Sequence, residues 1–123
     1  MTKNKKIKAF IVGGIVIAAA LVTIAVSIFI SCEKFGTPDF LSSFTAVIGI
    51  ACGNNDITAI DDGNILITST ENHTDRVARF LESKGARYDK ENSFGARMCF
   101  IKDNERFYYS VKVDSFYAVY RLL

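Results

Sequence analysis

An uncharged apolar run of 22 residues, Ala9 to Ile30, constrains this chain more than any other feature of its sequence. As a helix rising about 1.5 Å per residue, the run is about 33 Å long, which matches a bilayer hydrocarbon core of about 30 Å. A helix is the only form in which a single segment pairs all of its backbone polar groups inside lipid. We therefore expect residues 9–30 to form a transmembrane helix, with the lipid bilayer as a partner.

The charged residues that precede the run predict its orientation in the membrane. The only charged residues before it are four lysines within the first eight residues. Because positive charge is retained on the cytoplasmic side, residues 1–8 are predicted to be a cytoplasmic basic tail. Residues 31–37 then form a linker, and residues 38–123 form the outer domain of a single-pass cell-membrane protein. Gly14 and Ala18 have the small-xxx-small spacing that favours weak self-association of membrane helices.

Two forms of processing are alternatives to an intact span. A cleaved signal peptide has the same basic start, but its apolar region normally has about 7–15 residues. The segment Phe29-Ile30-Ser31-Cys32 resembles the bacterial lipobox, in which a cysteine after a small residue is lipidated and becomes the mature N-terminus. Phe29 departs from the usual leucine of that motif, and the run is longer than usual for it. We favour the intact span and keep lipidation of Cys32 as the alternative.

Charge and cysteine content exclude several classes of function for the remaining 93 residues. Four of the 15 Lys and Arg residues precede the span, so the other 11 meet all 13 Asp and Glu residues, and the net charge of the outer domain is close to −2. This charge argues against nucleic acid as a partner. Cys32, Cys52 and Cys99 lack CxxC spacing and His73 is the only histidine, so no metal site or cofactor is predicted. Cys52 and Cys99 form either a disulfide or two buried thiols, and both alternatives stay open.

Periodicity and turn signals predict two helices and a hairpin after the span. Thr37-Pro38-Asp39 is typical of a helix start, and apolar residues recur at helical spacing over 38–52. This helix is expected to pack on a sheet rather than lie on the bilayer, because its polar face has Ser and Thr but no lysine. Asp61-Asp62-Gly63-Asn64 is typical of a hairpin turn between β-branched runs. Thr74 or Asp75 is expected to cap a second helix, which closes at Gly85.

The C-terminal part of the chain has strand character, with one clear alternation of apolar and polar residues. The strand candidates cover residues 87–90, 94–102, 106–114 and 116–122. The predicted class is therefore α+β: an N-terminal transmembrane helix followed by a small antiparallel sheet with two helices on one face. On the last strand, alternation is expected to bury Phe116 and Tyr120 and to expose Tyr117 and Arg121.

Function is predicted from the composition of this domain and its C-terminal aromatic residues. Tyr108, Tyr117 and Arg121 are typical interface anchors, so the leading hypothesis is a non-enzymatic, membrane-anchored accessory or binding protein. Its outer domain would contact a partner protein or a component of the envelope. The rival hypothesis is a small envelope hydrolase, in which two carboxylates must converge in a pocket. Its candidate acids are Asp61, Asp62, Asp89 and Glu91. His73 is expected to be a solvated loop residue.

Overall fold

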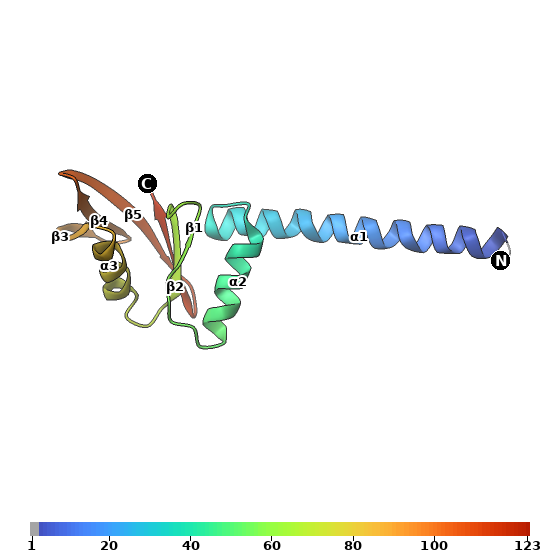
Figure 1. Ribbon diagram of the computed structural model, residues 1–123, viewed down its shortest axis with the longest axis horizontal. Coiled ribbons are helices and arrows are strands. Elements are labelled where there is room, and N and C mark those ends of the chain that lie inside the picture. Colours follow the sequence, from blue (N-terminus) through green and yellow to red (C-terminus); the bar gives the residue numbers. More distant parts are fainter. Residues whose placement is uncertain (1–2) are drawn as a thin grey trace.

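The structure is a computed structural model in which residues 3–123 are described. It contains three helices and six strands within those residues (Figure 1). The helices are α1 (Lys3–Phe35), α2 (Phe40–Ala51) and α3 (His73–Ser83). The strands are β1 (Thr58–Ile60), β2 (Ile65–Ser69), β3 (Arg87–Phe94), β4 (Arg97–Lys102), β5 (Glu105–Val113) and β6 (Tyr117–Leu122). The α+β class is confirmed.

The six strands form one antiparallel sheet in the order β1-β2-β6-β5-β4-β3. The hairpin turn falls at residues 61–64, as predicted, and Asp61, Asp62 and Gly63 all have positive φ there. The first predicted helix corresponds to α2, whose N-terminus is capped by the Asp39 carboxylate accepting a bond from the Ser42 amide. β3 is longer than predicted, because an irregularity between Asp89 and Phe94 lets the strand continue beyond residue 90.

The two shorter helices lie on opposite faces of the sheet, so the prediction that they share one face is wrong. On one face, Leu66 and Tyr120 cluster with Val77 and Leu81 of α3. On the other face, the neighbouring β2 residue Ile67 clusters with residues of α2 and with Phe35. The central strands β2 and β6 are therefore buried on both sides and need a cover on each.

The predicted linker, residues 31–37, is instead largely helical and packed against the domain. α1 continues to Phe35, and Ser31, Phe35 and Thr37 are buried. The Phe35 ring lies 6.5 Å from the Phe44 ring and 5.8 Å from the Tyr117 ring, measured between centroids. These apolar contacts hold the last turn of α1 in the core formed by α2 and the sheet, because separating them would expose the rings to water.

α1 projects from the domain as one long helix, and α2 runs crosswise to it beside its C-terminal end (Figure 1). α1 is long and apolar enough to cross a membrane, and only 6% of its most apolar 18-residue window is buried. The Thr23 hydroxyl donates to the Ala19 carbonyl at 2.8 Å, so this polar group is satisfied within the helix. Residues 3–8 of the predicted basic tail are part of α1, and residues 1–2 lie outside the described residues.

Candidate functional site

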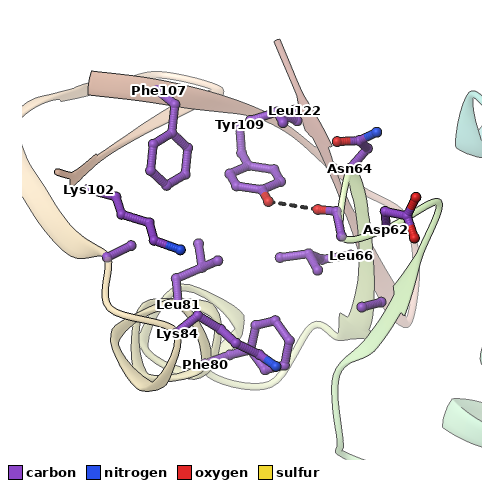
Figure 2. A pocket seen from close by; sticks show the side chains of 13 residues that line it. Asp62, Asn64, Leu66, Phe80, Leu81, Lys84, Lys102, Phe107, Tyr109 and Leu122 are labelled. Atoms are coloured by element: carbon purple, nitrogen blue, oxygen red, sulfur yellow. Dashed lines mark hydrogen bonds between the residues drawn. The ribbon is translucent and has the colours of Figure 1, made fainter. Parts of the chain in front are cut away.

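A cleft of about 540 Å³ lies between α3 and the sheet (Figure 2). Its floor is apolar, with Leu66 from β2, Leu81 from α3 and Phe107 from β5. The Tyr109 hydroxyl donates to the carbonyl of Gly63 at 2.7 Å and so ties β5 to the hairpin turn. Burial raises the pKa of Tyr109, so this hydroxyl keeps its proton at neutral pH. The cleft wall is therefore fixed by a hydrogen bond between two parts of the chain that are distant in sequence.

The margin of the cleft carries more positive than negative side chains. Lys102 at the end of β4 and Asp62 at the hairpin lie on opposite sides of the cleft, and Lys84 lies at its lower margin after α3 (Figure 2). The Lys84 ammonium lies 5.6 Å from the centroid of the Phe80 ring, a cation–π distance that keeps it beside the apolar floor. An apolar floor with a few charged groups at its margin is typical of a site that binds an apolar group bearing an opposite charge.

The carboxylates named for the hydrolase hypothesis form two separate pairs, and Asp89 and Glu91 line one shallow pocket on β3. Asp61 and Asp62 belong to the hairpin turn, and Asp62 borders the cleft. The Asp89 carboxylate accepts a hydrogen bond from Asn92 at 2.7 Å and lies 3.7 Å from Arg106. The bond from Asn92, and with it the charge of Arg106, lowers the pKa of Asp89. Because Tyr88 packs on the α3 side, alternation places Asp89 on the opposite face of the sheet from the cleft.

Tyr117 is buried and not exposed, so the predicted choice of face on β6 is wrong at this position. Its hydroxyl donates to the Asp114 carboxylate at 2.9 Å, and burial together with this bond raises the pKa of Tyr117 to about 12. Phe116, which was predicted to be buried, is exposed, whereas Tyr120 is fully buried as predicted. The face of Tyr117 is covered by Phe35, which the sequence assigns to a linker.

Arg121 and Tyr108 lie on the same face of the sheet as Tyr117. Arg121 donates to the carbonyl of Glu33 at 3.2 Å and lies over Gly36, where α1 ends with φ of +79°. Tyr108 is half-buried on β5, opposite Cys99. Two of the three predicted anchors, Tyr117 and Arg121, therefore hold the end of α1 to the domain, and Tyr108 is a diagonal neighbour of Arg121 on the same face of the sheet.

The three cysteines are free thiols. Cys52 is exposed at the end of α2, and Cys99 is buried in β4, so the structure forms no disulfide between them. Cys32 is exposed on α1, and its lipidation stays a prediction. Within residues 3–123, no three His, Cys, Asp or Glu side chains are grouped closely enough to hold a metal ion.

His73 begins α3 and is half-buried, so the expectation of a solvated loop residue is wrong. Its Nδ1 atom is hydrogen-bonded to the hydroxyl of Tyr120. Burial raises the pKa of Tyr120 to about 12, so its hydroxyl keeps its proton at neutral pH, and the tautomer of His73 decides which of the two groups donates. Burial and the nearby charge of Arg76 lower the pKa of His73. This bond joins the start of α3 to the centre of the sheet.

The lowered pKa of His73 predicts that acid weakens the fold. Near pH 6 the unfolded chain binds more protons at this residue than the folded chain, so the free energy of unfolding should decrease as the pH falls below about 6.5. We expect His73→Asn to show a smaller loss of stability between pH 7 and pH 5 than the wild type. Urea unfolding of both proteins at the two pH values measures this change in the free energy of unfolding. Equal pH dependence of the unfolding free energy in the two proteins would show that His73 does not cause the loss of stability in acid.

The cleft is the candidate site that could not be predicted from the sequence. Its lining comes from α3 and several strands that are distant in the chain, and no local motif marks their convergence. The only signal is the alternation of Phe107 and Tyr109 on one face of β5. Comparisons of the chain with models of protein families, with curated proteins and with solved structures find no match to it.

Proposed function

We propose that this chain is a membrane-anchored, non-enzymatic binding protein. α1 crosses the cell membrane with its lysine-rich start in the cytoplasm, and the α+β domain lies outside. The exposed apolar length of α1 supports the anchor, and the four lysines support the orientation. Of the four candidate acids only Asp62 lines the cleft, which supports binding over hydrolysis there, because acid–base catalysis by two carboxylates needs both in one pocket.

The observation that carries this proposal is the placement of the cleft on the α3 side of the sheet. The end of α1 and the whole of α2 pack on the other side. A cleft so placed faces away from the bilayer, where a partner outside the cell reaches it. Its lysines and apolar floor suit a carboxylate attached to an apolar group. The C-terminal carboxylate of a partner protein and an acidic component of the envelope share this chemistry.

Methyl NMR of the full chain in lipid nanodiscs tests the proposal with N-acetylphenylalanine and its uncharged amide as probes. We expect the carboxylate probe to shift the methyl signals of Leu66, Leu81 and Leu122, which line the cleft. The amide probe should bind more weakly. Changing Lys84 and Lys102 together to glutamine should weaken carboxylate binding about tenfold, which corresponds to about 1.4 kcal/mol.

Lys112 provides the matched control for that experiment. It is exposed on β5, next to Val111 of the cleft-side cluster and so on the opposite face. Lys112→Gln should leave the affinity unchanged, because the total charge falls but the cleft is intact. Equal affinity for the carboxylate and the amide, or an absence of shifts at the three leucines, would contradict the assignment of the cleft.

A further inference from the structure

An apolar stripe on α2 has no partner within residues 3–123. Leu41 and Ile48 are 69% and 62% exposed, and they share the outer side of the helix with Thr45. The opposite side of α2 buries Ala46 and Ile50 against the sheet. The sheet lies beyond the C-terminal end of α1 (Figure 1), so the outer side of α2 faces back along α1 towards its N-terminus.

Contacts between α1 and α2 fix the height of this stripe relative to the apolar run. The run ends at Ile30, and the hydroxyl of the next residue, Ser31, donates to the hydroxyl of Ser43 on α2 at 3.3 Å. One residue adds about 1.5 Å along a helix, so Ser43 lies close to the level at which the apolar run ends. A headgroup layer is about 5–8 Å thick on each side of the hydrocarbon core. α2 therefore begins at the depth of the headgroups.

Two of the three hydroxyl side chains of α2, those of Ser43 and Thr45, donate to backbone carbonyls of the protein. The Thr45 hydroxyl donates to the Leu41 carbonyl at 2.6 Å, and the Ser43 hydroxyl donates to the Asp39 carbonyl at 2.9 Å. No charged residue occurs between Phe40 and Ala51. Ser43 and the exposed Thr45, which argued in sequence against a bilayer contact, therefore use their hydroxyls internally.

We propose that α2 lies in the headgroup layer of the same bilayer that α1 crosses, with Leu41, Thr45 and Ile48 against lipid. This inference rests on the proposed membrane span of α1. The occupant is lipid because the covalent continuity of α1 with the domain holds the stripe at the bilayer surface. Burial of the Leu41 and Ile48 side chains in this layer would fix the tilt of the domain relative to the bilayer, whereas α1 alone only holds the domain at the surface.

Fluorescence quenching in phosphatidylcholine nanodiscs tests this contact. The two exposed cysteines, Cys32 and Cys52, are first changed to serine, and the buried Cys99 is kept. An NBD fluorophore is then attached at Ile48→Cys, and its emission is compared with and without lipids that carry a nitroxide near the headgroup. We expect at least twofold quenching by those lipids and a blue-shifted emission.

Two further labelled variants separate failure of this contact from failure of the anchor. Val16→Cys lies in the apolar run, and Glu82→Cys is exposed on α3 on the far side of the sheet. We expect quenching at position 16 by lipids that carry the nitroxide on the acyl chain, because this position lies about 10 Å inside the apolar run, and no quenching at position 82. Quenching at 16 without quenching at 48 overturns the α2 contact alone, and a blue shift at 48 without quenching assigns the stripe to a protein instead. Absence of quenching at 16 overturns the anchor.

Discussion

Replacing Phe35 by alanine should destabilise the outer domain by about 3–5 kcal/mol, the usual cost of removing a buried aromatic ring. Phe35 is only 2% exposed and contacts the rings of Phe44 and Tyr117. Domains of this size are stable by about 5–15 kcal/mol, so the loss should remove much of the stability. Urea unfolding of the full chain in nanodiscs, followed by near-ultraviolet circular dichroism, measures it.

Phe29 supplies the matched control for that variant. It lies on the same helix, six residues earlier, and is 65% exposed. Phe29→Ala should change the unfolding free energy of the domain by less than about 0.5 kcal/mol, because no packed ring is lost from the protein. Equal unfolding curves for Phe35→Ala and the wild type would show that α1 only tethers the domain and does not complete its core.

Phe100→Ala should have a comparably large effect on the other face of the sheet, with a loss of about 3–5 kcal/mol. Phe100 is fully buried on β4, and its ring lies 5.5 Å from the Tyr88 ring and 5.7 Å from the Phe107 ring, between centroids. Because Phe107 lines the cleft, the variant should also weaken binding of the carboxylate probe. The urea midpoint and the methyl NMR titration measure these two effects.

Phe94 on β3 is the control for Phe100, since it is 73% exposed. Phe94→Ala should alter stability by less than about 0.5 kcal/mol and leave the probe affinity unchanged. If Phe94→Ala and Phe100→Ala destabilise the domain equally, the cluster beneath α3 is not the main core.

Local signals made several elements predictable from the sequence. The Asp-Gly turn at 61–64 fixes a hairpin because few residues adopt positive φ, and the alternation in 106–114 identifies β5. The start of α2 was predictable to within two residues from Thr37-Pro38-Asp39, and the helix begins at Phe40 rather than at residue 38 because Asp39 is its cap. Each of these signals depends on neighbours in sequence, so it needs no knowledge of tertiary contacts.

Contacts between distant segments account for what the sequence did not reveal. The run Ile65-Leu66-Ile67 is apolar on both faces of its strand, which is the one local sign that helices cover both sides of the sheet. The burial of Tyr117 depends on Phe35, which precedes it by more than 80 residues. The cleft likewise depends on side chains from α3 and several strands, so no single segment predicts it.

The central claim is that α1 continues into the domain without a flexible linker. Electron–electron distance measurement between spin labels at Val22→Cys on α1 and Glu82→Cys on α3 tests it most directly, with Cys32 and Cys52 changed to serine and the chain in nanodiscs. The buried last turn of α1 predicts one narrow distance distribution. A flexible linker over residues 31–37 would spread the distance over about 15 Å or more, and such a broad distribution would contradict the account.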